Sequence, residues 1–354
     1  MARRTHALPG SLPGEVIRRK RLHRFEANVL RTVRERDLIQ PGRKVLAAVS
    51  GGPDSVALLR SLLAVSPELD ATVACCHVHH GLHPDADAHS EFVRGACDGL
   101  GVEFHLRHVD VRGRAQRECL SIEHAARLER YGALEAVAEH CGADLTATGH
   151  TATDRAETVL LNLFRGTGPD GLCGVPPKRG RIVRPLIDAT RAEVTRYLGG
   201  RHIEYVSDPT NELRDALRNR IRNEVVPFLE QTLERSVGTG LARLADAALL
   251  EREGVEAAVD LLWERAAPRE LPGGGLSLAR QALADVGRGA ATLVLRRCVD
   301  TVAGPGQAPN LAQLLQVLKL LDSHTGFGEQ RVGACVFVRR RGELLVLPAL
   351  PGNK

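Results

Sequence analysis

Six residues near position 50 have the composition of an anion-binding turn. The segment Ser50-Gly51-Gly52-Pro53-Asp54-Ser55 directly follows the apolar run 45–49 and precedes the apolar residues 56–59. Glycines accept positive φ and let a backbone approach a phosphate closely, and the first turn of a helix offers unpaired N–H groups at its positive end. Ser50 and Ser55 add hydroxyl donors. The pattern therefore predicts a strand, a phosphate-binding turn and a helix.

Asp54 places a carboxylate beside this predicted phosphate site. Two anionic groups are stable side by side when a cation bridges them, so we interpret Asp54 as a Mg²⁺ ligand. The turn contains no lysine, and it does not match the Walker A pattern G-x-x-x-x-G-K-S/T. The alternative is an ordinary turn of small residues, which the match of six residues makes the weaker interpretation.

Apolar and amphipathic segments alternate along the chain before residue 227. We predict strands at residues 45–49, 72–78, 102–109, 144–148 and 182–187. We predict helices at residues 25–38, 89–100, 121–141 and 192–198. This alternation is typical of α/β proteins with a doubly wound parallel sheet. Ligands of such sheets bind beyond the carboxyl ends of the strands, which is where the turn at 50–55 would lie.

The character of the chain changes after Pro227. Helical patterns dominate at 228–267, 279–302 and 311–321, residues 268–275 have the composition of a linker, and 332–339 with 343–347 predict a terminal β-hairpin. We therefore divide the 354 residues into a basic flexible arm, a catalytic domain and a mainly helical C-terminal domain, with bounds 1–24, 25–227 and 228–354. For the arm, contact with RNA, a transit peptide and a tail without a role are open alternatives.

Composition limits the classes of function. The net charge of +5 and the pI of about 8.9 are compatible with a polyanionic partner, while an aromatic content of 3% argues against extensive base stacking. The cysteines form no C-x-x-C pair, which argues against a zinc knuckle or an iron–sulfur site of the usual spacing. Scattered cysteines, with no apolar run of bilayer length, predict a cytoplasmic protein without a membrane span.

The segment 50–55 resembles the S-G-G-x-D-S signature of the PP-loop ATP pyrophosphatases, which have an adenine nucleotide alpha hydrolase-like fold. The resemblance implies that these six residues bind ATP, that the loop holds its pyrophosphate, and that AMP is transferred to a substrate oxygen. The loop alone does not distinguish among family members such as NAD synthetases, tRNA thiolases and lysidine synthetases.

Residues 77–83 resemble the H-V-N-H-G-L-R segment of lysidine synthetases. His79 stands in place of the Asn and His83 in place of the Arg. The match implies a lysine- or tRNA-binding role for His80. A metal site built from these histidines is the weaker alternative, because no cysteine or carboxylate has ligand spacing nearby.

Residues 149–158 resemble the pattern G-H-h-x-D-D-q-x-E-T, with Thr153 in place of the first Asp. Asp154 and Glu157 are three residues apart, so they share a face of the predicted helix and also complement its dipole. The resemblance implies that His150, Asp154 and Glu157 belong to the catalytic site, with Asp154 serving Mg²⁺ or lysine activation and Glu157 the lysine amine. Without that context, two favourable first-turn acids explain the pattern equally well.

Arg127 and Arg130 match the A-A-R-x-x-R-Y helix of the same synthetases, and residues 165–174 match their R-G-S/T-G-x-x-G-L-x-G loop. The resemblance implies a lysine- or tRNA-binding role for both arginines. Ion pairs within the helix are the alternative explanation for Arg127 and Arg130.

Residues 207–211 and 218–222 resemble D-x-S/T-N and R-N-x-I/L-R, which we associate with lysidine synthetases. Arg214, Arg218 and Arg222 recur at a spacing of four residues, so on a helix they would form one face. Such a face is suited to lysine- or tRNA-binding through RNA phosphates, and a solvated basic face is the alternative.

Together these segments cover residues 45–227 and resemble the tRNA(Ile)-lysidine synthetase family. The resemblance implies a ligase that uses ATP and Mg²⁺ to adenylate the wobble cytidine of the isoleucine tRNA with anticodon CAU, and then replaces AMP with L-lysine. Mg²⁺ would be held by Asp54 and Asp154, and the C-terminal domain would grip the tRNA. The oligomeric state, a homodimer included, is open. A tRNA 2-thiolase and a non-catalytic RNA-binding module are the alternatives.

Overall fold

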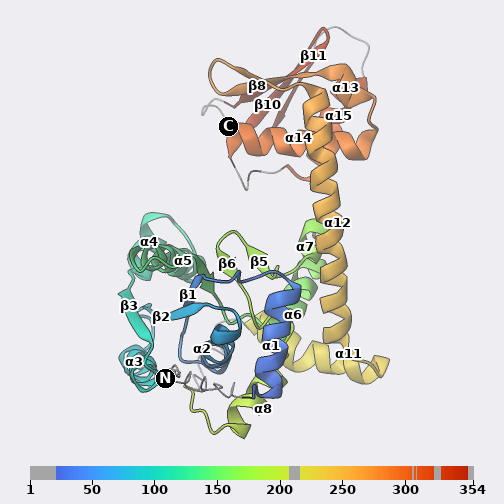
Figure 1. Cartoon of the computed structure of the whole chain (residues 1–354). Coiled ribbons are helices and arrows are strands. Elements are labelled where there is room, and N and C mark those ends of the chain that lie inside the picture. The colour runs from blue at the N-terminus through green and yellow to red at the C-terminus, as the bar shows by residue number, and fades with distance from the viewer. Residues whose placement is uncertain (1–20, 207–215, 305–306, 308, 323–327, 350–354) are drawn as a thin grey trace, which may run out of the picture. The chain divides into compact units, whose positions relative to one another are not determined.

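The computed structural model describes residues 21–206, 216–304, 307, 309–322 and 328–349. The chain forms two compact units, Met1–Asp246 and Ala247–Lys354 (Figure 1). The division falls within helix α12 (Val237–Ala266), later in the chain than the domain boundary predicted at residue 227. Most of the predicted N-terminal arm lies outside the described residues.

A six-stranded sheet forms the centre of the first unit, in the order β3-β2-β1-β4-β6-β5. All neighbouring strands are parallel except the antiparallel pair β5 and β6. The strands are β1 (Lys44–Ala48), β2 (Thr72–His79), β3 (Glu103–His108), β4 (Leu145–Ala147), β5 (Lys178–Arg179) and β6 (Ile182–Val183). The doubly wound α/β fold and its five predicted strands are confirmed. The last of them is shorter than predicted, because Pro185 has no N–H for a sheet ladder.

Helices cover both faces of this sheet, as the continuous apolar runs of its strands require. Val45 and Ala47 of β1 pack on one face with α1, α2, α3 and α8, while Leu46 packs on the other with α5 (Figure 1). The bounds are α1 (Arg24–Glu35), α2 (Pro53–Val65), α3 (Ala86–Leu100), α5 (Ile122–His140) and α8 (Arg191–Gly200). Each of these matches a predicted helix or, for α2, the helix expected after the turn.

The described part of the first unit contains seven further helical elements besides the start of α12. They are η1 (Ser66–Glu68), α4 (Val111–Arg117), α6 (Ala152–Phe164), α7 (Pro169–Leu172), α10 (Ala216–Arg220), the π-helix η2 (Ile221–Val225) and α11 (Val226–Leu233). The π-helix ends at Val225, two residues before Pro227 in the first turn of α11. A proline within a helix removes one hydrogen bond and crowds the carbonyl four residues earlier, which accounts for the wider turn at this place.

The second unit contains a five-stranded antiparallel sheet in the order β7-β8-β11-β10-β9. Its strands are β7 (Arg269–Leu271), β8 (Gly275–Ala279), β9 (Gly328–Val332), β10 (Cys335–Arg340) and β11 (Glu343–Pro348). Helices α13 (Arg280–Ala284), α14 (Arg288–Ala303) and α15 (Leu311–Asp322) accompany it. Phe337, which has no exposed surface, lies in the apolar core that the sheet and these helices share.

The predicted hairpin is confirmed as β10 and β11, but the rest of this sheet was not expected. Residues 268–275 are not a linker, because they contain β7 and the turn into β8. The predicted strand 332–339 is broken by the turn at Gly333, which has a φ of 58°. The predicted helix 279–302 is divided by Gly287, whose φ is 78°. No described helix is long and apolar enough to span a bilayer.

An ion-pair network anchors the first turns of α12 within the first unit. Asp246 accepts hydrogen bonds from Arg36 at 2.9 and 3.0 Å, and its Oδ1 lies 2.7 Å from Nη1 of Arg155, whose side chain has no exposed surface. Arg36 also holds Asp188 through two hydrogen bonds of 2.6 and 2.8 Å. Burial alone would raise the pKa of Asp246, but the two guanidinium groups hold it below its usual range. The network joins α1, α6, α12 and the segment before α8.

Asp246→Asn should destabilise the chain, because it leaves the buried guanidinium of Arg155 without its anion. We expect a loss of about 3 kcal/mol in the free energy of unfolding, measured by urea titration. Asp260→Asn is the control on the same helix: Asp260 pairs with Arg297, both side chains are exposed by 39% or more, and the expected loss is below about 1 kcal/mol. Equal losses for the two variants would contradict the anchoring role.

Candidate active site

The turn at residues 50–55 joins β1 to α2, as predicted. Gly51 has a φ of 92°, which a residue with a side chain rarely adopts. The Ser55 hydroxyl donates to the Gly52 carbonyl at 2.9 Å and accepts from the Ser50 backbone N–H at 3.1 Å. Gly52 caps α2 without a side-chain hydrogen bond, and Pro53 fits the first turn, where an N–H has no helical partner. The loop therefore presents backbone donors at the positive end of a helix, which is an arrangement that binds phosphate.

Gly149 brings the second motif against this loop. A Cβ atom at Gly149 would lie 3.0 Å from the Asp54 carbonyl oxygen and 3.2 Å from the Ser55 nitrogen, too close for any other residue type without backbone movement. Because Gly149 follows β4 and the loop follows β1, the two segments meet at the carboxyl ends of neighbouring parallel strands. This contact fixes the start of α6 beside the phosphate loop.

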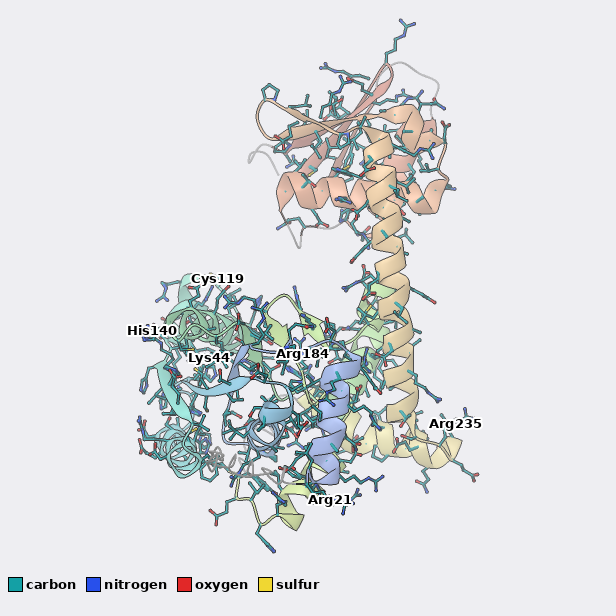
Figure 2. All side chains as sticks on the ribbon, in the orientation of Figure 1. Arg21, Lys44, Cys119, His140, Arg184 and Arg235 are labelled. Atoms are coloured by element: carbon teal, nitrogen blue, oxygen red, sulfur yellow. The ribbon has the colours of Figure 1, made fainter. Side chains whose placement is uncertain are left out.

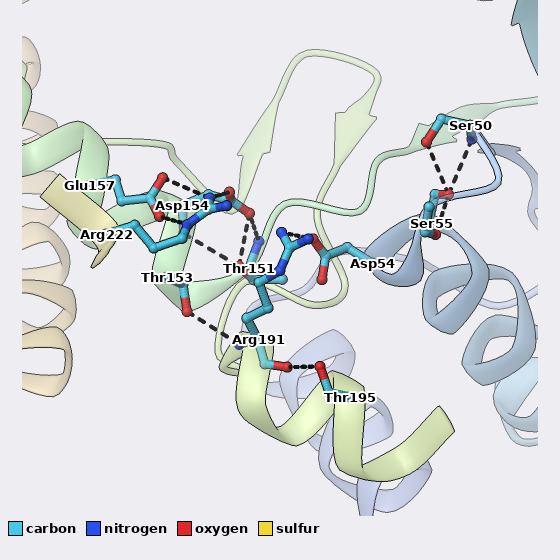
Figure 3. Close-up of polar contacts among 11 residues, drawn as sticks. Ser50, Asp54, Ser55, Thr151, Thr153, Asp154, Glu157, Arg191, Thr195 and Arg222 are labelled. Carbon is cyan, nitrogen blue, oxygen red and sulfur yellow. Dashed lines mark hydrogen bonds and ion pairs between the residues drawn. The ribbon is translucent and has the colours of Figure 1, made fainter. Parts of the chain in front are cut away.

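The two acidic residues of α6 differ in their surroundings (Figure 3). Asp154 closes a capping box, in which its Oδ2 accepts hydrogen bonds from the backbone N–H and hydroxyl of Thr151, both at 2.8 Å. Glu157 is 1% exposed and accepts two hydrogen bonds from Arg222, at 2.6 and 3.0 Å. Burial raises the pKa of Glu157, and the Arg222 guanidinium opposes that rise. Arg222 also lies 3.6 Å from Oδ1 of Asp154, so this arginine joins both acids.

Asp54 lies on the other side of the site. Its Oδ2 accepts a hydrogen bond from Nη1 of Arg191 at 2.8 Å, while its Oδ1 is buried and has no hydrogen-bond partner among the described residues (Figure 3). Burial raises the pKa of Asp54 to about 6, and the negative charges of Asp154 and Glu157 contribute. A buried carboxylate oxygen without a donor is a site that a cation would occupy favourably.

Arg191 was not singled out from the sequence, although it contacts the predicted catalytic aspartate. It is the first residue of α8, and its backbone N–H donates to the Thr153 hydroxyl at 3.2 Å. Thr153, which departs from the family pattern, thus acts as a hydrogen-bond acceptor at this position. The Ala152 N–H donates to the Ala189 carbonyl at 2.8 Å. The start of α8 and the segment before it therefore hold the start of α6, and the Arg191 side chain contacts Asp54.

His150 lies in a basic environment behind the acids. Its Nδ1 is 2.9 Å from the Thr148 hydroxyl. Burial lowers its pKa to about 4, and Arg184, Arg130 and Arg127 lower it further while Asp154 opposes them. His150 is consequently a neutral imidazole at pH 7. Arg184, labelled in Figure 2, follows β6 directly and donates to the Pro176 carbonyl at 2.7 Å.

Arg127 and Arg130 lie on α5 and flank the ring of Tyr131. Their guanidinium carbons are 5.4 and 5.3 Å from the ring centroid. Both arginines lower the pKa of His150, so their charges lie within electrostatic reach of the second motif. A lysine- or tRNA-binding role for the two arginines stays a prediction.

The histidine segment follows β2, as expected. His77 donates from Nδ1 to the Val49 carbonyl at 2.8 Å, which links the end of β2 to the residue before the loop. His80 lines a cavity of about 410 Å³ together with His108 and Arg112. His79, at the Asn position of the family pattern, lies 3.1 Å from Asp87. Among the residues that the structure covers, no group of three or more His, Cys, Asp or Glu side chains is arranged to hold a metal ion.

The predicted arginine face is only partly described. Arg214 and the segment 207–211 lie outside the described residues. Arg218 Nη2 is 3.4 Å from the Thr158 hydroxyl, and Arg222 is bound to Glu157. The last described residue before the gap, Val206, donates its N–H to the Gly51 carbonyl at 2.9 Å. This hydrogen bond places Val206 beside the phosphate-binding turn.

Comparison with known proteins agrees with these motifs. A PP-loop domain family matches residues 21–229. A tRNA(Ile)-lysidine synthase from Chlorobaculum tepidum is 37% identical over 256 residues, which are 72% of this chain and 77% of that protein. One from Gloeobacter violaceus is 33% identical over 88% of this chain and 92% of that protein. The chain spans between 44% and 63% of the length of four other relatives of the same name.

A solved structure shares the fold. The U34-tRNA thiolase from Methanococcus maripaludis with its 4Fe-4S cluster has a TM-score of 0.54 and 20% identity, over 64% of this chain and 80% of that chain. The parallel sheet, the PP-loop match and two relatives that this chain covers to 77% and 92% of their length lead to one conclusion. The chain belongs to the tRNA(Ile)-lysidine synthase family of PP-loop enzymes.

Proposed function

We propose that this chain converts the wobble cytidine of the CAU-anticodon isoleucine tRNA to lysidine. In the first step, the cytidine O2 attacks the α-phosphorus of ATP, and pyrophosphate leaves with the electron pair of the broken P–O bond. In the second step, the ε-amine of L-lysine attacks the activated ring carbon, AMP leaves, and the amine loses a proton. The first step is needed because the ring oxygen is a poor leaving group, whereas AMP is a good one.

One observation carries this proposal. The contact of Gly149 with the backbone of Asp54 and Ser55 places the phosphate-binding turn directly against the helix that carries Asp154 and Glu157. A nucleotide bound at the turn would therefore have its reacting phosphate close to the acids that serve the amine. Proximity of this kind is a large part of the catalysis of a two-substrate transfer.

The metal proposal rests on Asp54. Its buried Oδ1 has no hydrogen-bond partner among the described residues, which fits a carboxylate that can bind a cation. Mg²⁺ is commonly held by one or two carboxylates together with substrate phosphates, so Asp54 and Asp154 would hold it with ATP. When bound, Mg²⁺ would neutralise charge on the phosphate oxygens. The loop N–H groups would orient the pyrophosphate in the same place.

We assign the lysine amine to Glu157 and its proton to Asp154. Glu157 is held by Arg222 in a fixed, two-pronged ion pair, so its carboxylate is oriented before substrate binds. Oδ1 of Asp154, which the capping box does not use, is the oxygen that would accept the amine proton. His150, neutral by burial, can orient a substrate by hydrogen bonding without adding charge.

For the tRNA, we propose contacts of phosphate groups with Arg127, Arg130 and Arg218, and with the second unit. We place the reaction in the cytoplasm. The adjacent cysteines do not support the alternative that the chain is a tRNA 2-thiolase. Cys75 and Cys76 are both buried in the apolar cores on opposite faces of the sheet, so they cannot form a shared iron–sulfur or persulfide site.

The direct test is AMP release with a transcript of the CAU-anticodon isoleucine tRNA. We expect release to require both ATP and L-lysine, and to disappear when the wobble cytidine is replaced by uridine. A rate independent of lysine, or equal with both transcripts, would contradict the proposed reaction. No release of AMP or pyrophosphate with any tRNA would favour the RNA-binding alternative.

Asp54→Asn should make the stability of the ligand-free chain less dependent on pH. Folding favours the protonated side chain of Asp54, since its pKa is about 6 in the folded chain against an ordinary value of 3.8. The stability that this protonation contributes is complete below pH 3.8 and is lost as the pH rises through 6. Between pH 4 and pH 7.5, the free energy of unfolding of the variant should therefore rise relative to that of the native chain, by up to about 3 kcal/mol.

Urea titrations at the two pH values measure this gain. Asp144→Asn is the control: the lowered pKa of Asp144 places its titration below pH 3.8, so this variant should change little relative to the native chain between pH 4 and pH 7.5. At pH 7.5, ATP with Mg²⁺ should stabilise the native chain and not Asp54→Asn. Equal stabilisation of both proteins by the nucleotide would show that Asp54 does not serve the metal or the phosphates. Asp54→Ala should abolish pyrophosphate release while the fold remains.

Glu157→Gln should raise the KM for L-lysine far more than the KM for ATP, because the neutral amide loses a charge-assisted contact with the amine. We expect about a tenfold to hundredfold rise for lysine. Steady-state kinetics measure both constants, and Glu135→Gln on α5 is the control for an exposed glutamate. Similar rises for the two substrates would assign Glu157 a structural or metal-binding role instead.

A further inference from the structure

Arg191 has an unusual place for a cation. It is the first residue of α8, at the helix end where the dipole disfavours positive charge, and Thr190 with Glu193 already caps that helix. An arginine adds nothing to helix formation there. Its guanidinium instead extends to Asp54 at the phosphate-binding turn, 2.8 Å from Oδ2 (Figure 3). The position is therefore explained by what the side chain reaches and not by the helix.

Arg222 and Arg191 differ in how many of their N–H donors bind carboxylates. Arg222 makes two hydrogen bonds to Glu157 and lies near Asp154, so its donors face acids. Arg191 makes one hydrogen bond to a carboxylate through a single nitrogen, and its side chain is 39% exposed. An arginine has five N–H donors, and the hydrogen bonds of the described residues use only one of those on the Arg191 side chain. Such a group is suited to bind an anion with more than one oxygen.

Phosphates bound at the turn need a positive side chain nearby. Residues 50–55 contain no lysine or arginine, and Asp54 adds a negative charge where phosphates would bind. Arg191 is the cation that the described structure places against this aspartate. Displacement at the α-phosphorus leaves the electron pair of the broken P–O bond on pyrophosphate, whose added charge must be neutralised.

We propose that Arg191 is a catalytic residue that binds the pyrophosphate part of ATP and stabilises it as the leaving group. The inference rests on the proposed function for the identity of the reaction, but its consequence for binding can be tested separately. Arg191 should distinguish ligands that contain a pyrophosphate group from ligands that do not.

The test is calorimetric titration of the full-length chain with pyrophosphate, ATP and AMP, each with Mg²⁺. Arg191→Gln should weaken pyrophosphate and ATP binding about tenfold or more and change AMP binding less than about twofold. Arg191→Lys, which keeps the charge but not the fork of donors, should recover part of that loss. Arg196→Gln, an exposed arginine of the same helix, should change none of the three affinities.

Two results would overturn the inference. Equal weakening of pyrophosphate and AMP would mean that Arg191 only supports the shape of the site, and unchanged pyrophosphate affinity would mean that it does not touch this group. If Arg191→Gln failed to fold, Arg191→Lys would decide the matter. The inference then requires that this variant bind pyrophosphate more weakly than the native chain while its AMP affinity stays nearly the same. These titrations contain no tRNA or lysine, so their outcome is independent of whether lysine-dependent AMP release is observed.

Discussion

The approach of Gly149 to the backbone of Asp54 and Ser55 is the contact on which the site depends. Two segments far apart in the sequence each follow a parallel strand, and β1 and β4 are neighbours, so their carboxyl ends meet. A Cβ atom at Gly149 would lie 3.0 Å from the Asp54 carbonyl oxygen, so a larger residue would force the turn and the segment before α6 apart. The acids of α6 and the phosphate-binding groups of the turn therefore share one site.

Charge balance is the second constraint on the site. Three carboxylates, on Asp54, Asp154 and Glu157, lie within electrostatic reach of one another, and burial raises the pKa of two of them. Arg222 compensates Glu157 closely, whereas Arg191 compensates Asp54 through one contact and leaves Oδ1 without a donor. The charge of Asp54 is therefore only partly neutralised by the described residues, and a metal–nucleotide complex would neutralise the rest. Sites built for function commonly carry such a cost in stability.

Local patterns predicted the parts of the fold that local physics determines. Apolar runs identified the strands of the parallel sheet, and the glycines and serines of 50–55 identified the turn. In the second sheet the hairpin β10–β11 was predicted, but β7 and β9 consist mostly of polar residues with exposed or half-exposed side chains, so no apolar pattern indicated them. The pairs Asp54–Arg191 and Glu157–Arg222 join distant segments, and no spacing in the sequence indicates them. Arg218 and Arg222 both reach α6, at Thr158 and Glu157, although the four-residue spacing in the sequence does not name these partners.

In the proposed reaction, AMP is attached to the tRNA before lysine reacts. The most direct measurement uses ATP labelled in its α-phosphate, the full-length chain and the CAU-anticodon isoleucine tRNA, without lysine. We expect the label to become attached to the tRNA as pyrophosphate is released, and added L-lysine then to free the label as AMP. Label that never joins the tRNA, while lysine is nevertheless incorporated, would contradict the proposed reaction.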